Sequence, residues 1–244
     1  IARKADPKRR EPYLAAGQLA LDKHDFALAA RRFDEGLKQI PDDADLHYGR
    51  AMAFASSDRQ EMGASLANAL KINPRHLPSL ILMASQRIDA EDYDGARELI
   101  QQIQKINPVQ PDAAAFQAVI AHLKHEPTAE QAARELALRY WTNNPAVPHR
   151  IGAKLSQKYR FAEGAALQRE ALGFDPDYLP AKAQLANDLL RLGDEAEGWT
   201  LAQEVYAKDG YDVTMFNLVT LRDTLSRYTT LTNAHFTVRM DSKE

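Results

Sequence analysis

Apolar residues recur at spacings of three and four along most of the chain, in pairs of runs separated by short polar turns. In the first pair, Tyr13 and Gly17 fall on one face, a polar turn follows at residues 23–25, and Ala29 and Phe33 mark the next run. This spacing is that of an amphipathic α-helix. The pattern predicts an all-α protein built from antiparallel helix pairs.

Prolines divide the chain at nearly regular intervals. Pro41, Pro74, Pro108, Pro145 and Pro176 each follow an apolar run, at separations of 33, 34, 37 and 31 residues. Proline has no N–H and clashes with the preceding turn, so each one ends a helix. We therefore predict six helix pairs and a capping helix, over residues 10–43, 44–76, 77–110, 111–145, 146–178, 179–212 and 213–226.

Small residues stand at equivalent places in the repeats. In the first helices they are Gly17, Ala51, Ala84, Gly152 and Ala186, and in the second helices Ala29, Ala96, Gly164 and Gly198. A hydrogen or a methyl group at a helix crossing lets two helices approach closely. We expect these residues to lie at the contacts within each pair.

Together these residues resemble the tetratricopeptide repeat (TPR) family, from about Arg10 to about Leu225. The resemblance implies a right-handed α-solenoid, an open curved rod whose first helices line a concave wall. Departures occur at Met62, which replaces a small residue, and in the fourth unit. There we expect Pro127 to interrupt the unit and a longer second helix to carry Tyr140 and Trp141, and the register of the first helix is left open.

The resemblance also implies which side chains face the concave wall. The inward positions are Leu14, Gln18, Leu21, Tyr48, Met52, Ile81, Ser85, Ile88, His149, Asn187 and Leu190. The first half of this wall is apolar, which suits an amphipathic helix or an extended hydrophobic segment. The alternative is that these residues only pack against neighbouring units or against the tail of the chain.

Composition narrows the choice of partner. The formal net charge is -3, from 31 basic and 34 acidic residues, so no overall field attracts nucleic acid. The chain has no cysteine and no apolar run long enough to span a membrane. We expect a protein or peptide partner, with bacterial cytoplasm and periplasm both left open as the compartment.

Only one cluster invites a metal hypothesis. His122, His125 and Glu126 are close in sequence, but the histidines are three apart and Pro127 follows at once. A zinc-protease helix needs histidines four apart with the glutamate after the first. A solvated helix end is the simpler interpretation, so we expect no metal, no cofactor and no catalytic residue.

Both ends differ from the repeats. Residues 1–10 are basic and are predicted to form a linker, with a docking tail for an acidic partner as the alternative. The chain begins at Ile1, and we expect it to be a segment of a longer protein. In the tail at 227–244, the alternation from His235 to Met240 predicts one edge strand, which either packs back on the last helices or begins a further domain.

Three functions follow from these observations. The leading hypothesis is a protein-interaction module that binds a peptide, helix or partner domain in the concave groove. The second is the non-catalytic helical arm of a larger bacterial enzyme, because residues 217–240 resemble the junction between TPR repeats and a gluzincin-class zinc-peptidase domain. The third is a homo-oligomeric scaffold that associates through its end helices.

Overall fold

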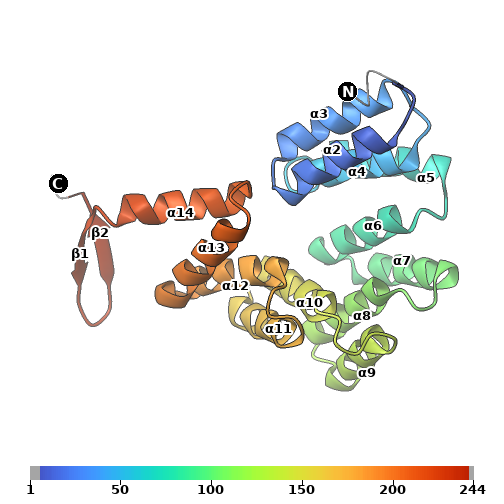
Figure 1. Ribbon diagram of the computed structural model, residues 1–244. Helices are drawn as coiled ribbons and strands as arrows, with labels where there is room; N and C mark the ends of the chain where they lie inside the picture. The colour runs from blue at the N-terminus through green and yellow to red at the C-terminus, as the bar shows by residue number, and fades with distance from the viewer. Residues whose placement is uncertain (1–5, 242–244) are drawn as a thin grey trace.

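The computed structural model describes residues 6–241, which form thirteen α-helices and one two-stranded sheet (Figure 1). The helices are α2 (Glu11–Asp22), α3 (Phe26–Leu37), α4 (Ala44–Phe54), α5 (Arg59–Ile72), α6 (Leu77–Asp89), α7 (Tyr93–Ile106), α8 (Pro111–Leu123), α9 (Pro127–Leu138), α10 (Ala146–Gln157), α11 (Phe161–Phe174), α12 (Leu179–Leu192), α13 (Glu195–Lys208) and α14 (Val213–Leu225). The strands are β1 (Thr229–Thr232) and β2 (Thr237–Met240).

Consecutive helices pack as pairs from α2 with α3 to α12 with α13, and α14 follows the sixth pair. The pairs are stacked in chain order along a strongly curved path (Figure 1). The helix pairs predicted from the periodicity are therefore confirmed, and so is the α-solenoid that the resemblance implied. None of the described helices combines the length and the apolar character that crossing a membrane requires.

The turns inside the pairs repeat one backbone conformation. A residue with positive φ ends the reversal in five of the six pairs: His24, Glu91, His125, Tyr159 and Gly193. A left-handed residue just past a helix redirects the chain and lets the last carbonyl groups be satisfied. Aspartate often comes next: the side chain of Asp25 accepts a hydrogen bond from the Leu28 N–H at 3.0 Å, which caps α3.

The predicted small residues lie at the helix contacts. Ala29, Ala51, Ala84 and Ala96 are completely buried. In the fifth pair, a Cβ built on Gly152 would lie 3.0 Å from the carbonyl oxygen of Gly164, and one built on Gly164 would lie 3.1 Å from the carbonyl oxygen of Gly152. Larger side chains would push α10 and α11 apart.

Phe33 joins the first two units. Its ring is 1% exposed and faces two glycines, Gly17 on α2 and Gly49 on α4. A Cβ on Gly17 would lie 2.4 Å from the ring, and one on Gly49 would lie 2.2 Å from it. The aromatic ring therefore occupies the space that both glycines leave free.

The fourth unit differs from its prediction. Pro127 does not interrupt a helix but stands at the first position of α9, where its missing N–H costs no hydrogen bond. The second helix is not longer either: α9 ends at Leu138, and Tyr140 and Trp141 lie beyond it, 73% and 57% exposed.

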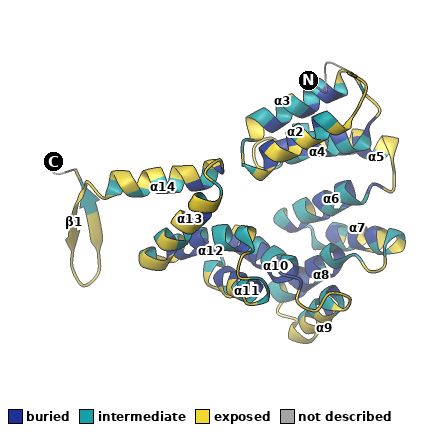
Figure 2. Cartoon of the chain, in the orientation of Figure 1, coloured by how far each residue is buried: buried dark blue, intermediate teal, exposed yellow. Residues whose placement is uncertain are grey.

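Helix α8 explains why its register could not be placed. Every residue of α8 from Ala113 to Ala121 is buried except Gln117. Helix α8 is accordingly mostly dark blue in Figure 2. A helix that is covered on all sides is apolar all round and has no polar face to reveal its orientation. Residues of α6, α7, α9 and α10 join it in the largest hydrophobic cluster.

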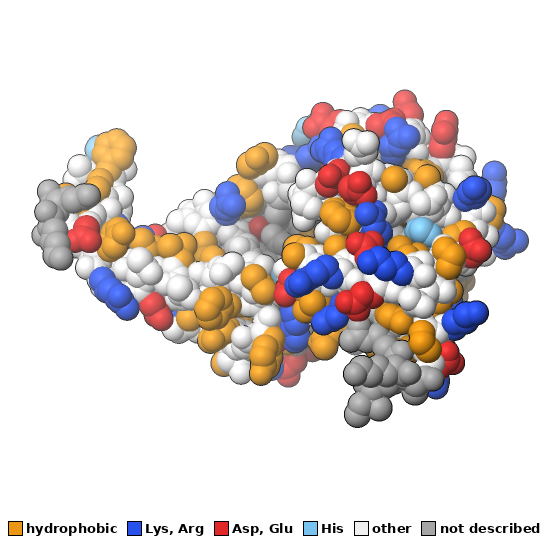
Figure 3. Space-filling view, turned by 90° about the horizontal axis from the view of Figure 1, so that it is seen from above, with side chains coloured by type: hydrophobic (Ala, Val, Ile, Leu, Met, Phe, Trp, Pro, Cys, Tyr) orange, Lys and Arg blue, Asp and Glu red, His pale blue; other side chains and the backbone are white. Residues whose placement is uncertain are grey.

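The C-terminal tail forms a hairpin and not the single strand predicted. Strands β1 and β2 pair antiparallel, with Leu231 opposite Val238 and Thr230 opposite Arg239. The Arg239 guanidinium donates to Glu195 on α13, with Nη1 2.9 Å from Oε1, which ties the hairpin to the last pair. Apolar side chains are exposed along the arm made by α14 and the hairpin (Figure 3). Among the exposed residues of α14 is Phe216.

The first ten residues do not form a solvated linker throughout. Residues 1–5 lie outside the described part of the chain, but Arg10 borders α2 and pairs with Asp43 at 3.0 Å and with Asp45, at the start of α4. The Tyr13 hydroxyl also donates to the carbonyl of Pro7, at 3.2 Å. The basic segment thus helps to join the first unit to the second.

The resemblance implied an open rod, but the two ends of the stack are in contact. The turn at residues 23–25 of the first pair contacts the loop between α13 and α14, and the Val213 N–H donates to the carbonyl of Lys23 at 2.9 Å. The stack therefore curls until its first and last units meet.

Replacing Phe33 by alanine should lower the free energy of unfolding by about 3–5 kcal/mol, because glycines on both sides cannot fill the cavity. The matched control is Gly63→Ala on α5, where a Cβ would meet no atom within 4 Å. Alanine there should raise stability by about 0.5–1 kcal/mol through helix propensity. Urea unfolding followed by circular dichroism measures both, and equal midpoints for Phe33→Ala and the parent would contradict the packing described.

Candidate binding groove

A cavity of about 710 Å³ opens on the side lined by first helices of the second, third and fifth units. Its lining comes from α4, the turn after it and the start of α5, from α6, and from α10 and the residue after it: Met52, Ala55, Ser56, Ser57, Asp58, Arg59, Leu82, Ser85, Gln86, Asp89, Lys154, Gln157 and Lys158. These units are not all neighbours in the chain. The cavity therefore exists because the stack is bent enough to bring α10 opposite α4.

The cavity wall has two kinds of surface. Met52, Ala55 and Leu82 provide apolar atoms from α4 and α6. Hydroxyl and amide groups stand beside them, among them Gln86 and Gln157. Amide side chains can both donate to and accept from a peptide backbone, so this combination can hold apolar side chains and satisfy the main chain that carries them.

A buried lysine crosses from the fifth unit to the third. The Lys154 side chain is 9% exposed, and its Nζ lies 2.8 and 2.9 Å from the two carboxylate oxygens of Asp89. Burial lowers the pKa of Lys154, and the charge of Asp89 opposes that shift. Lys158 adds a hydrogen bond from its Nζ to the Asp89 carbonyl at 2.9 Å. These contacts fix the distance between α6 and α10.

The predicted wall residues do not all reach this cavity. Met52 and Ser85 line it. Leu21 and Ile88 are 8% and 1% exposed and belong to the hydrophobic core. Three further wall positions are half-buried and pack against the hydrophobic clusters of the core: Leu14, Tyr48 and Ile81.

The remaining predicted positions are engaged locally. Gln18 is exposed and donates to Asp22 at 2.7 Å, within α2. Asn187 donates to the carbonyl of Ala183 at 2.9 Å, one turn back on α12. Leu190 fills the space beside Gly198, where a Cβ would lie 2.9 Å from it.

His149 lies in a half-buried aromatic and polar cluster at the start of α10. Its Nδ1 is 2.8 Å from the amide oxygen of Gln168, and its ring packs edge-on against Tyr178 with centroids 5.6 Å apart. Burial lowers the pKa of His149, so the neutral imidazole is favoured. Next to it, Arg150 forms an ion pair with Asp112 of α8.

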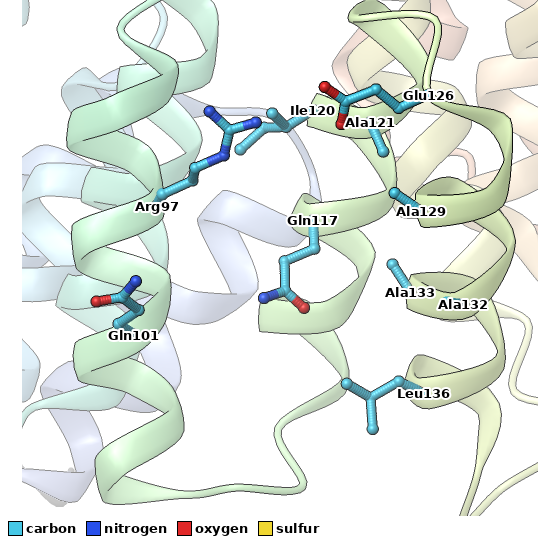
Figure 4. Close-up of a pocket in the computed structure, with 10 residues that line it drawn as sticks. All are labelled: Arg97, Gln101, Gln117, Ile120, Ala121, Glu126, Ala129, Ala132, Ala133 and Leu136. Carbon is cyan, nitrogen blue, oxygen red and sulfur yellow. The ribbon is translucent and has the colours of Figure 1, made fainter.

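A second cavity, of about 440 Å³, lies between the second helices of the third and fourth units. Arg97 and Gln101 on α7 face Gln117 on α8, and alanines of α9 form the opposite side (Figure 4). The sequence analysis did not identify it. The signal available was the spacing of Ala129, Ala132 and Ala133, which places three short side chains on one face of α9, too short to reach α7.

His122 is more engaged than a solvated helix end would be. Its Nδ1 lies 2.9 Å from Glu130 on α9, and its Nε2 is hydrogen-bonded to Glu163 on α11. The histidine thus joins the fourth unit to the fifth. Within residues 6–241, no group of three or more histidine, cysteine or acidic side chains has the arrangement of a metal site.

Comparison with known proteins supports the fold through structure and not through sequence. No family model and no curated protein matches the sequence. Among solved structures, the APC/C hetero-tetramer Cut9–Hcn1 superposes with a TM-score of 0.58 at 15% identity, over 89% of this chain and 44% of that one. A thermophilic TPR protein of Thermus thermophilus gives 0.56 at 17% identity, over 75% of this chain and 100% of that one.

The chain has the TPR fold. PilF of Pseudomonas aeruginosa is a further TPR neighbour, with a TM-score of 0.54 at 13% identity, over 87% of this chain and 97% of PilF. The chain spans less than half the length of the Cut9–Hcn1 chain that it matches. At these identities the likeness is one of fold.

One buried carboxylate, on α12, has no cationic hydrogen-bond partner among residues 6–241. Asp188 on α12 is 1% exposed and accepts hydrogen bonds from the Ser156 hydroxyl and the Gln184 amide, both at 2.9 Å. Burial raises the pKa of Asp188. The Ser156 oxygen also lies 3.0 Å from the carbonyl oxygen of Gly152. Its single O–H can donate to that carbonyl in place of Asp188, which leaves the oxygen free to accept from an amide at position 188.

Replacing Asp188 by asparagine should therefore raise the free energy of unfolding at pH 7 by about 1–2 kcal/mol, because an ionised carboxylate no longer has to be buried. The folded state of the parent holds this proton more tightly than the unfolded state does. The parent should therefore recover relative stability as the pH falls through the raised pKa toward about 3.9, the ordinary value for aspartate.

Chemical unfolding of both proteins at several pH values checks this expectation. The control is Asp223→Asn on α14, an exposed aspartate whose replacement should change stability little at any pH. A stability difference for Asp188→Asn that stays constant with pH, or that favours the parent at pH 7, would contradict it.

Proposed function

We propose that the chain is a protein-interaction module that binds a peptide or an extended segment of a partner protein in the 710 Å³ cavity. The observation that supports this most directly is the composition of the cavity wall. Apolar atoms of Met52 and Leu82 adjoin hydroxyl and amide groups on α6 and α10. Ligand sites are concave and combine apolar side chains with polar groups that fix the orientation of the ligand.

The form of the ligand follows from the shape and chemistry of the site. An apolar side chain of the ligand would occupy the space beside Met52, and its backbone would pair with Gln86 or Gln157. Methionine adapts to different apolar shapes because it is unbranched and flexible. The site therefore suits a short segment with one or two apolar anchors more than a long charged one.

The charged side chains at the cavity are largely neutralised by one another. Lys154 pairs with Asp89, and Lys158 bonds to Glu91 at 3.1 Å. A strongly acidic or basic ligand would have to break these pairs. Specificity in this proposal comes from apolar fit and backbone hydrogen bonds, in line with the nearly balanced charge of the whole chain.

Filling or charging the cavity should weaken peptide binding about tenfold or more, which corresponds to ~1.4 kcal/mol or more. The variants are Met52→Lys and Ser85→Trp, both at half-buried cavity positions. The probe is a set of peptides selected from a random phage-displayed library against the parent chain, with affinity measured by fluorescence anisotropy.

The control is Val109→Lys, in an exposed turn between α7 and α8 and outside the cavity lining, with the fold of each variant checked by thermal melting. Binding that survives both cavity variants, or a library that yields no binder, counts against the proposal.

A further inference from the structure

The first turn of the stack and the loop between its last two helices form a defined contact. The Val213 N–H donates to the carbonyl of Lys23 at 2.9 Å, and the Lys23 ammonium pairs with Asp209. His24 Nδ1 lies 2.8 Å from Asp212 Oδ2. The Lys23–Asp209 ion pair and the His24–Asp212 hydrogen bond join residues 186 and 188 positions apart in the chain. We name Lys23, His24, Asp209, Asp212 and Val213 the latch.

The latch is partly shielded from solvent. The side chains of Asp212, Asp209 and Lys23 are 8%, 19% and 28% exposed, and that of His24 is 43% exposed. Salt screens buried or partly buried pairs less than it screens pairs on an open surface. The Lys23–Asp209 ion pair should therefore be screened by salt less than an ion pair on the open surface.

Both sides of the latch are held in position by local structure. Asp212 also accepts from the Met215 N–H at 2.8 Å, which caps α14. His24 has a φ of 57°, the left-handed conformation that recurs in these turns, and its ring packs edge-on against Phe26. The contact therefore joins two preformed surfaces.

Units one and two otherwise form a body with a limited connection to the rest. Their core is a separate hydrophobic cluster around Phe33, distinct from the cluster of the third to fifth units. Across the junction, Leu82 of α6 packs with Met62 and Leu66 of α5. His76 Nε2 adds one polar tie, 2.9 Å from Asp45 of α4.

The two walls of the cavity belong to the two sides of this junction. Met52 and Arg59 come from the second unit, and Lys154 and Lys158 come from the fifth. Lys154 is fixed to the third unit by Asp89. A rotation of units one and two about residues 73–76 would therefore change the width of the cavity, and the latch is placed to prevent that rotation.

We propose that the latch holds the stack in a closed ring and sets access to the cavity, so that its release lets units one and two swing outward. The closure itself is independent of any ligand. Its role as a control on binding rests on the proposed function. The mutual geometry of Lys23, Asp209, His24 and Asp212 at the meeting of the first and last units carries the inference.

The ring closure is tested by charge reversal and rescue. The chain has no cysteine, so labels placed at Ala27→Cys and Gly210→Cys report one distance across the latch. Ala27 is exposed, and a Cβ at Gly210 would make only an ordinary contact, 3.7 Å from the Tyr206 carbonyl. Pulsed electron resonance between spin labels gives the distance distribution.

In the parent the distribution should be short and narrow. Lys23→Glu should lengthen and broaden it, and the exchange Lys23→Glu with Asp209→Lys should restore it. Lys208→Glu, which reverses a charge of an exposed pair with Asp177, should leave it unchanged. A short distance that survives Lys23→Glu, or a long one that the exchange does not shorten, overturns the latch.

Access to the cavity is tested with Ser85→Cys as the only thiol, modified by a bulky maleimide. Lys23→Glu should speed the modification several-fold, and the exchange variant should return it to the parent rate. Ser226→Cys, exposed just after α14, should react at one rate in all three backgrounds. Equal rates at residue 85 overturn the control of access, whether or not peptides bind the cavity.

Discussion

The close approach of helices at residues without large side chains is the constraint on which this fold depends. At the fifth pair each glycine faces the backbone of the other, and at the first two units Phe33 fills the room left by Gly17 and Gly49. Close packing makes such contacts intolerant of added atoms. The curvature of the stack, and with it the position of the cavity, follows from how closely successive pairs approach.

The helix pairs could be predicted because their signals are local. Helical periodicity, the regular prolines and small residues such as Ala96 each report on one or two turns of chain. The register of the fourth unit's first helix could not be predicted because α8 is buried on every side, so its sequence lacks a polar face. Tyr140 and Trp141 are expected at the end of a longer second helix, yet both lie beyond α9 and are exposed.

The cavity could be predicted only in part. Met52 and Ser85 followed from the position of first helices in a repeat, but Lys154, Gln157 and Lys158 did not. These three residues line the cavity only because the fifth unit faces the second and third. Such contacts between distant units produce no periodic pattern in the sequence. From the sequence alone, Lys154 of α10 would be expected on the surface, because nothing local indicates that α6 lies beside it.

The contact between Lys154 and Asp89 joins the fifth unit to the third, past α8. In a simple solenoid each unit touches only its neighbours, so units can form and melt nearly independently from either end. Contacts that skip a unit raise the mean sequence separation of contacting residues, which slows folding. They also couple the melting of the repeats that they join, so the third to fifth units should gain and lose their structure together where a plain array of repeats would fray.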